Sequence, residues 1–133
     1  MNKNKTKNSS YKKTISIVSP CFNEEDNVIN LYNTVFKIMQ KQPYNYEHIF
    51  IDNSSTDSTV SKIKKLAKKD KNLKLIVNTR NFGTIRSPFY GITQSSGDAC
   101  ILIACDFQDP PELINEFIKS WKNGFKVILA KKE

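Results

Sequence analysis

Apolar stretches of strand length alternate along this chain with segments in which apolar residues recur every three or four positions. The first pattern predicts β-strands and the second predicts amphipathic helices. The predicted strands, rich in Ile, Val, Leu or Phe, cover residues 14–20, 47–53, 73–79, 98–106 and 126–130. The apolar positions of the predicted helices are Val28, Leu31, Val35 and Met39, then Val60, Ile63 and Leu66, and finally Leu113, Phe117 and Trp121. This alternation predicts a three-layered α/β fold, with a parallel sheet built from right-handed β-α-β units.

Two helix starts are predicted from the prolines and their neighbours. Proline is tolerated in the first turn of a helix but is costly in its interior, so Ser87 is expected to cap a short helix that begins at Pro88. In the last helix, Asp109 is expected to cap the N-terminus, Pro110 to take the first helical position and Glu112 to cap in return. Such capping accounts for Asp109 and Glu112 without any function.

The most informative stretch starts as an apolar run and ends in polar side chains. Residues 99–105 carry no charge, which is typical of a strand that is covered on both faces of a parallel sheet. Asp106 follows where the strand leaves the core, and Gln108 comes two residues later. Ligands of open α/β sheets bind outside the carboxyl ends of the strands, so a ligand role for these two residues is favoured over a solvated loop.

Polar clusters follow three of the predicted strands. They comprise residues 19–25, 52–59 and 106–109. Each cluster alone has a structural explanation, because acids favour the positive end of a following helix and Asp57 can cap the second helix with Thr56 or Ser58. The carboxyl ends of parallel strands lie on one edge of a sheet, however, and three such clusters together predict a binding site.

Both arginines of the chain, Arg80 and Arg86, lie just beyond the third predicted strand. Arginine recognises phosphate or carboxylate in a planar, bidentate way that lysine does not. Salt bridges to surface acids explain the pair equally well from the sequence. The four glycines complete neither a G-x-G-x-x-G motif nor a P-loop, so bound phosphates would need a metal or arginines.

The net charge of +8 is concentrated near the N-terminus. Residues 1–13 hold five lysines and no acid, which predicts a disordered basic tail ahead of one domain over residues 14–133. The sequence shows neither the apolar core of a signal peptide nor about 18 consecutive apolar residues, so a soluble, cytosolic chain is expected. A lysine-rich helix at residues 62–71 has no interleaved aromatics, which favours a solvated face over binding to lipid or nucleic acid.

Cysteine and histidine usage argues against disulfides and zinc. Cys21, Cys100 and Cys105 form no C-x-x-C pair, and the last two fall on opposite faces of one predicted strand. His48 is the single histidine, so zinc ligation is not supported and reduced structural thiols are expected.

Four segments, in order, resemble the motifs of family 2 glycosyltransferases. They are Pro20-x-Phe22-Asn23-Glu24-Glu25, Ile51-Asp52-x-Ser54-Ser55-Thr56-Asp57-x-Thr59, Arg80-Asn81-Phe82-Gly83 and Asp106-Phe107-Gln108-Asp109-Pro110-Pro111-Glu112. The resemblance spans roughly residues 14–130 and is strongest to the polyprenol-phosphate sugar transferases, which include dolichol-phosphate mannose synthase and undecaprenyl-phosphate glucosyltransferases. It implies a three-layer GT-A (Rossmann-like) parallel sheet, of which this chain holds the N-terminal nucleotide-binding part, truncated before the acceptor-binding half.

The resemblance implies a role for each matching residue. The nucleotide-binding residues that it implies, together with the two arginines, are Pro20, Phe22, Glu24, Asp52, Arg80 and Arg86. Asp106 and Gln108 would hold Mg²⁺ or Mn²⁺ against the diphosphate, which makes Asp106 the predicted catalytic residue. A hard divalent cation bound by one or two protein oxygens stabilises the charge that develops on a departing diphosphate.

Two positions depart from the pattern of the family. Ala104 stands where the family has the first Asp of Asp-x-Asp, and Asn53 replaces the second Asp of an Asp-Asp pair. The first change removes a carboxylate from the metal site, and the second is expected to alter how the base is read. The absence of a general base fits a polyprenyl phosphate acceptor, which is ionised at neutral pH because the second pKa of a phosphate monoester is about 6.

The sequence therefore predicts part of a metal-dependent inverting hexosyltransferase that uses a UDP- or GDP-linked sugar and a polyprenyl phosphate. It would act at the inner face of the cell membrane, without a nucleic-acid partner, and self-association is left open. Two alternatives remain. One is a polysaccharide glycosyltransferase with a hydroxyl acceptor and a downstream carboxylate base, and the other is a non-catalytic module that binds a nucleotide sugar.

Overall fold

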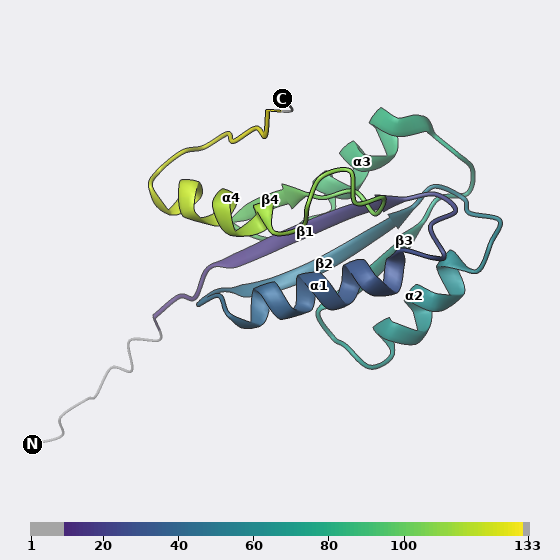
Figure 1. The fold of residues 1–133 in the computed structure, drawn as a ribbon, viewed down its shortest axis with the longest axis horizontal. Helices are drawn as coiled ribbons and strands as arrows, with labels where there is room; N and C mark the ends of the chain where they lie inside the picture. The colour runs from purple at the N-terminus through teal and green to yellow at the C-terminus, as the bar shows by residue number, and fades with distance from the viewer. Residues whose placement is uncertain (1–9, 132–133) are drawn as a thin grey trace, which may run out of the picture.

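Four parallel strands form the central sheet of the computed structural model, which describes residues 10–131 (Figure 1). The strands are β1 (Thr14–Cys21), β2 (Asn45–Asp52), β3 (Leu73–Val77) and β4 (Ala99–Leu102), in the spatial order β3-β2-β1-β4. The chain thus runs outward from β1 to β3 and then returns to the other side of β1. In open α/β sheets, ligands bind beyond the carboxyl ends of the strands at such a reversal, which falls here between β1 and β4.

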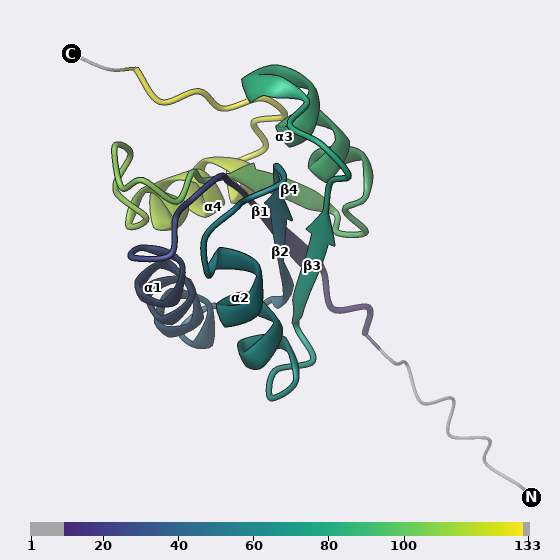
Figure 2. The ribbon, with the colours of Figure 1, turned by 90° about the vertical axis from the view of Figure 1, so that its right-hand side faces the viewer.

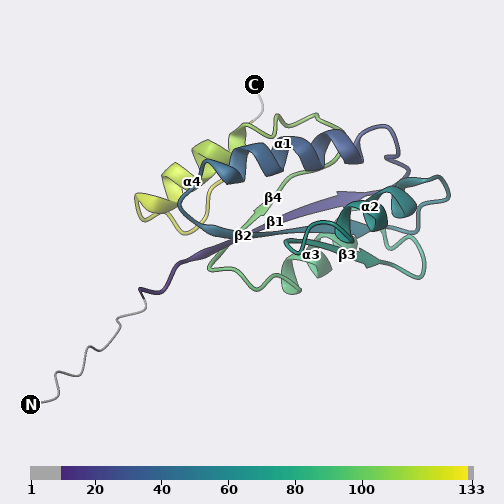
Figure 3. The ribbon, with the colours of Figure 1, turned by 90° about the horizontal axis from the view of Figure 1, so that it is seen from below.

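Helices cover both faces of the sheet, as the three-layered prediction requires. In the described part of the chain they are α1 (Val28–Gln40), α2 (Thr59–Ala67), α3 (Gly83–Thr93) and α4 (Leu113–Lys122). Helices α1, α2 and α4 pack on one face, and α3 packs on the other (Figure 2 and Figure 3). Among these described helices, none is both long and apolar enough to cross a membrane.

The main core lies between the sheet and the layer of three helices. Ile15 of β1, Phe50 of β2 and Leu31 of α1 are fully buried there. Since side chains alternate along a strand, Val18 and Ile51 point to the opposite face and form a smaller core beneath α3. The two cores fix the register of the strands and hence the position of the loops at their carboxyl ends.

Helix α3 presents small residues to the sheet and large apolar residues to the outside. Ser87 and Gly91 are buried, whereas Ile85, Phe89 and Tyr90 are 81%, 65% and 50% exposed. This orientation is the reverse of that of an ordinary amphipathic helix on a sheet. The exposed apolar surface of α3 is therefore a feature that the core packing does not explain.

The prediction that Ser87 caps a helix beginning at Pro88 is wrong. Helix α3 begins at Gly83, and Pro88 lies inside it. The Ser87 hydroxyl accepts a hydrogen bond from Asn78 Nδ2 at 2.9 Å, so it ties the helix to the end of β3 rather than capping it. Proline has no N–H, and the helix forgoes one backbone hydrogen bond at this position.

The predicted start of the last helix at Pro110 is also wrong. Helix α4 begins at Leu113, and no capping hydrogen bond comes from the side chain of Glu112 just before it. The N–H groups of Leu113 and Ile114 donate to the carbonyls of Pro110 and Pro111, each at 3.0 Å. A tight turn therefore occupies the place predicted for the first turn of the helix.

The sheet is smaller at its β4 edge than the sequence predicts. Strand β4 covers four residues of the predicted 98–106, and Leu102 is 46% exposed while Ile101 is buried. The uncharged run is thus covered on one face only, because α3 packs mainly against β1 and β2. The strand predicted at 126–130 is wrong, since this segment is irregular in the structure and Val127 is 78% exposed. This apolar segment has no neighbouring strand to pair with in the described part of the chain, and a β-strand needs such a partner.

Residues 1–9 of the predicted tail lie outside the described residues. Two residues that were assigned to the tail contact the domain. The Tyr11 hydroxyl donates to the Asp98 carboxylate at 3.0 Å, and Lys13 Nζ lies 5.1 Å from the centre of the Trp121 ring. Ordered contacts therefore begin ahead of the boundary predicted at residue 13.

Candidate functional site

The loops that follow β1 and β2 are joined by hydrogen bonds at the carboxyl edge of the sheet. The Asn23 N–H donates to Ser55 Oγ, and Asn23 Oδ1 accepts from the Thr56 N–H, both at 2.8 Å. The Ser55 N–H and hydroxyl donate in turn to the Asp52 carboxylate at 2.9 and 2.5 Å. These contacts confirm that the first two polar clusters meet at one edge.

A second set of bonds connects the same loops to the start of α2. The Glu25 carboxylate accepts from the Ser58 N–H at 3.0 Å and from the Ser58 hydroxyl, and these bonds lower the pKa of Glu25. The Glu25 N–H donates to Asp57 at 3.2 Å, and the Glu24 N–H donates to Thr59 Oγ1 at 2.9 Å. The N-cap of α2 is Ser58, which makes no side-chain capping bond, and Asp57 just before it accepts from the Thr59 N–H at 2.9 Å at the first residue of the helix.

Asp52 is fully buried at the end of β2, beneath the joined loops. Its oxygens accept from Ser55, and the Cys21 thiol lies 3.8 Å from Asp52 Oδ1. A carboxylate with these partners shapes the turn that follows β2. Its predicted contact with a base or ribose would require the buried carboxylate to become accessible.

The other predicted nucleotide-binding residues after β1 lie nearer the surface. Phe22 is 45% exposed directly after the strand, and Pro20 is half-buried near its end. Glu24 is also half-buried, and its carboxylate accepts from Asn27 Nδ2 at 2.7 Å. Phe22 therefore offers an accessible aromatic face beside the joined loops.

Asn53 connects this edge to the segment that follows β3. Its side-chain oxygen accepts from the Phe82 N–H at 2.8 Å, and its amide group donates to Asn81 Oδ1 at 2.9 Å. The guanidinium of Arg80 lies over the Phe82 ring, 4.4 Å from its centre. The position at which the resemblance expects a second Asp is thus occupied here by a residue that holds the Arg80 segment.

The arginines make no ion pair with the described residues, where the salt bridge found joins Lys74 and Glu47. Arg80 and Arg86 are both exposed, Arg80 in the loop after β3 and Arg86 in the first turn of α3. The salt-bridge interpretation of the pair is therefore not supported. Within residues 10–131, no ion pair competes with an anionic ligand for either guanidinium group.

Asp106 and Gln108 lie together in the loop after β4. Both are exposed, and Asp106 Oδ1 accepts from the Gln108 N–H at 3.2 Å. Within the described residues no three His, Cys, Asp or Glu side chains are grouped as a metal site. One carboxylate and one amide oxygen nevertheless fit Mg²⁺ or Mn²⁺, which prefer oxygen and commonly complete their shell with phosphate and water.

Two buried thiols link the β4 loop to the other two loops. Cys21 pairs with Asp52 in the β1–β2 register, and Ile103 donates to the Val18 carbonyl at 2.9 Å, so the chain after β4 continues beside β1. The neighbouring Cys105 thiol, together with burial, raises the pKa of Cys21. The cysteines are free, as predicted, and Asp106 directly follows the buried Cys105.

Each of the three loops contains a non-glycine residue in the left-handed region of backbone space. These residues are Asn23 with φ 51°, Ser54 with φ 68° and Phe107 with φ 57°. Such conformations are uncommon outside glycine and concentrate at functional sites. The sequence gives little warning of them, since only asparagine among the three tolerates this region readily.

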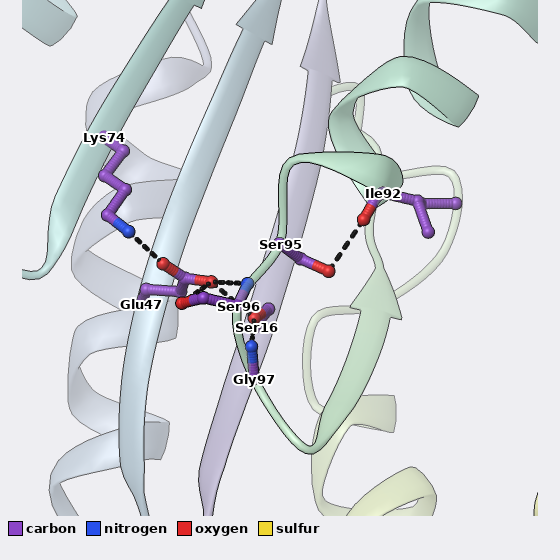
Figure 4. Close-up of polar contacts among 7 residues, drawn as sticks. All are labelled: Ser16, Glu47, Lys74, Ile92, Ser95, Ser96 and Gly97. Atoms are coloured by element: carbon purple, nitrogen blue, oxygen red, sulfur yellow. Dashed lines mark hydrogen bonds and ion pairs between the residues drawn. The ribbon is translucent and has the colours of Figure 1, made fainter.

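The sequence interpretation also missed a buried carboxylate near the other end of the sheet. Glu47 of β2 accepts the Ser16 hydroxyl at 2.6 Å, the Ser96 N–H at 2.7 Å and the ammonium of Lys74 (Figure 4). Burial by itself would raise the pKa of Glu47, but these hydrogen bonds lower it to about 2. Glu47 thus joins three strands to the connection before β4 and is structural.

A cavity of about 720 Å³ lies along the outer edge of β4, away from most of the polar loops. Leu102, Trp121 and the segment 126–130 line it, together with Asp109. The three polar loops, rather than this cavity, hold the side chains that could bind a nucleotide.

The polar loops after β1, β2 and β4 lie at the carboxyl edge of a parallel α/β sheet, which is where ligands of such sheets bind. The sequence profile described as Glycosyl transferase family 2 matches residues 16–131. The chain therefore belongs to glycosyl transferase family 2, which confirms the resemblance predicted from its motifs.

Curated relatives share much of the chain. A bactoprenol glucosyl transferase of Shigella phage SfV is 42% identical over 118 residues, which cover 89% of this chain and 38% of the relative. A prophage bactoprenol glucosyl transferase homolog of Escherichia coli is 40% identical over 118 residues, covering 89% of this chain and 39% of the homolog. The chain thus spans well under half the length of these relatives.

Solved structures share the fold. Staphylococcus aureus TarS, residues 1–349, has a TM-score of 0.63 and 22% identity, covering 82% of this chain and 32% of that protein. The mannosyltransferase PcManGT of Pyrobaculum calidifontis, in complex with GDP-Man and Mn²⁺, has a TM-score of 0.56 and 20% identity, covering 73% of this chain and 28% of that protein. These neighbours confirm the predicted GT-A type of fold.

Proposed function

We propose that this chain is the donor-binding part of a glycosyltransferase that moves a hexose from a nucleoside diphosphate sugar to a polyprenyl phosphate. The observation that carries the proposal is the joining of the β1 and β2 loops at the same edge of the sheet as the exposed Asp106 and Gln108, in a chain 42% identical to a bactoprenol glucosyl transferase. The name of that relative supplies the lipid class of the acceptor and the hexose.

Donor binding would use the accessible groups around the three loops. Phe22, 45% exposed, offers its ring to a base, and Pro20 and Glu24 lie beside it. Asp52 is buried and would contribute indirectly, because its carboxylate holds the turn that ends in Ser55. The exposed guanidinium groups of Arg80 and Arg86 would contact the phosphates.

Asp106 and Gln108 would hold Mg²⁺ or Mn²⁺, which lowers the cost of the negative charge on the departing diphosphate. A solved neighbour binds Mn²⁺ with its sugar nucleotide, which supports a divalent ion here. The ionised acceptor phosphate would attack C1 of the sugar directly, and the C1–O bond to the diphosphate would break with inversion. Because that phosphate is already a nucleophile at neutral pH, its attack needs no general base.

The exposed face of α3 supports a membrane-bound acceptor. Ile85, Phe89 and Tyr90 lie outward there with Arg86, and no acid occurs from Thr79 to Gly97. Aromatic and apolar side chains beside arginines are typical of surfaces that bind anionic lipid. We expect this face to contact the inner surface of the cell membrane, next to the loops that bind the donor.

A vesicle experiment tests that contact separately. The chain is sedimented with phosphatidylglycerol vesicles and with phosphatidylcholine vesicles, and binding is expected to the first alone. Phe89→Ser should reduce binding severely, whereas Phe36→Ser, at a 39% exposed position on α1, should not. Equal binding of the two variants would show that the exposed face of α3 does not contact the membrane.

A non-catalytic module that binds a nucleotide sugar is the second candidate, and Ala104 is the observation that favours it. Ala104 leaves Asp106 without the second carboxylate of the family pattern. Both candidates require donor binding, and turnover by a chain that includes the acceptor-binding part separates them.

The test of the donor site is a thermal-shift panel with UDP, GDP, CDP and ADP, each with and without Mn²⁺. A ligand at 100 times its Kd adds about 2.7 kcal/mol to stability, which gives a clear shift. We expect a Mn²⁺-dependent shift with UDP or GDP that Asp106→Asn abolishes and Asp26→Asn, at an exposed position in the same edge of the fold, retains. A folded wild-type chain with no shift from any diphosphate would contradict the proposal.

A further inference from the structure

The Asn53 side chain uses its full hydrogen-bonding capacity. It is 7% exposed and makes four bonds, all to residues 78–83, which run from the end of β3 to the first residue of α3. Its Oδ1 accepts from the Phe82 N–H at 2.8 Å and from Asn78 Nδ2 at 3.2 Å. Its Nδ2 donates to Asn81 Oδ1 at 2.9 Å and to the Gly83 carbonyl at 3.1 Å.

These four bonds bracket Arg80 on both sides. Asn78 precedes the arginine, and its own N–H is fixed by the Asp52 carbonyl at 2.9 Å. Phe82 follows it and carries the ring over which the guanidinium lies. The position of Arg80 is therefore set by Asn53, although no bond joins the two residues directly.

The arrangement needs an amide at position 53. A carboxamide has two donors and an acceptor oxygen, whereas an ionised carboxylate only accepts. Asp at this position would keep the bonds from Phe82 and Asn78, but it would lose both donated bonds. It would also place a negative oxygen against Asn81 Oδ1 and the Gly83 carbonyl, so the segment would be pushed away.

We infer that Asn53 is a positioning residue of the donor site, which holds Arg80 where the guanidinium meets the nucleoside diphosphate. The inference rests on the proposed function for its ligand, and on the four bonds for its mechanism. It gives a physical role to a residue whose chemistry differs from the acid expected by the family motif. Affinity for the donor, rather than turnover, is the quantity that Asn53 controls.

A double-mutant cycle tests this role on the full chain. UDP and GDP are titrated calorimetrically with Mn²⁺ into the wild type, Asn53→Asp, Arg80→Ala and the double variant. Each single change is expected to raise the Kd about tenfold, and the double variant should raise it no further, because both changes disable the same contact. Asn33→Asp, an equal charge change at an exposed position of α1, should leave the Kd unchanged.

Losses that multiply in the double variant would overturn the inference, since they would show that Asn53 acts independently of Arg80. Amide hydrogen exchange of the ligand-free chain gives a second readout. The Phe82 N–H should exchange faster in Asn53→Ala, which removes the acceptor of its hydrogen bond, and at the wild-type rate in Arg80→Ala; an unchanged rate in Asn53→Ala would show that Asn53 does not fix the segment. If the wild type binds neither diphosphate, the donor assignment fails, while exchange at Phe82 still decides whether Asn53 fixes the segment.

Discussion

Asn23 Oδ1 accepts a hydrogen bond from the Thr56 N–H 2.8 Å away, and this bond spans the loops after β1 and β2. Asn23 has φ 51°, so this residue adopts a left-handed backbone conformation and also supplies a side-chain acceptor. Its N–H also donates to Ser55 Oγ at 2.8 Å. The joining of the two loops therefore depends on a residue that is both tolerant of the left-handed region and able to accept a hydrogen bond.

Substitutions at Asn23 should separate the two requirements. Asn23→Asp keeps an acceptor and should be nearly neutral, Asn23→Gly keeps the backbone but loses the acceptor, and Asn23→Ala loses both. We expect Asn23→Ala to lower the free energy of unfolding by about 2–3 kcal/mol and Asn23→Gly by about 1 kcal/mol. Urea unfolding measures the series; equal losses for Ala and Gly would mean that the backbone conformation contributes nothing.

The Glu47 carboxylate should make stability depend on acid pH. Its pKa of about 2 lies below the ordinary value of 4.5, so the native state binds its proton less readily than the unfolded chain. The resulting stabilisation is present above pH 4.5 and is lost as the pH falls toward 2. A shift of this size corresponds to about 3 kcal/mol.

Glu47→Gln should therefore flatten the acid limb of the stability curve, which urea unfolding at a series of pH values measures. Glu116→Gln, at an exposed position of α4, is the matched control and should leave the curve unchanged. An acid limb of the same depth in Glu47→Gln would assign the pH dependence to other carboxylates.

The limits of the sequence interpretation follow from what a local pattern can encode. The apolar period of β1 and the polar residues after it predicted a buried strand and an edge site, because burial and chain direction are local properties. The four bonds of Asn53 and the bonds of the buried Glu47 join segments far apart in the chain. A local sequence pattern therefore could not predict them. The strand predicted at 126–130 failed for the same reason, since its pairing partner is not encoded within it.

The prediction that a helix begins at Pro88 was wrong, because tertiary contacts of α3 outweigh the preference of proline for the first turn of a helix. Ser87 and Gly91 allow α3 to lie against the sheet, and the bond from Asn78 to Ser87 holds the helix in place. Packing and this bond stabilise a helix that includes the proline. Local rules thus predicted that a helix exists but placed its start five residues too late.

Gly91→Ala should destabilise the fold through the close approach of α3. A Cβ atom at this position would lie 2.9 Å from Val18 Cγ1 and 3.0 Å from Ile51 Cγ2, in the small core beneath the helix. We expect a loss of about 1–3 kcal/mol, despite the better helix propensity of alanine. Urea unfolding measures it beside Thr84→Ala, at an exposed position of the same helix. A stabilised Gly91→Ala variant would show that α3 can move outward at no cost.

Ala104→Asp should strengthen the proposed metal site. Ala104 is half-buried two residues before the exposed Asp106, so an aspartate there would add a second carboxylate close to the first. Hard divalent cations gain affinity with ligand charge, and we expect the Kd for Mn²⁺ in the presence of UDP or GDP to fall about tenfold. Calorimetric titration of Mn²⁺ measures the change, and adding Asp106→Asn to Ala104→Asp should reverse it. An Mn²⁺ affinity that does not respond to either substitution would place the ion elsewhere and would leave Asp106 without its proposed role.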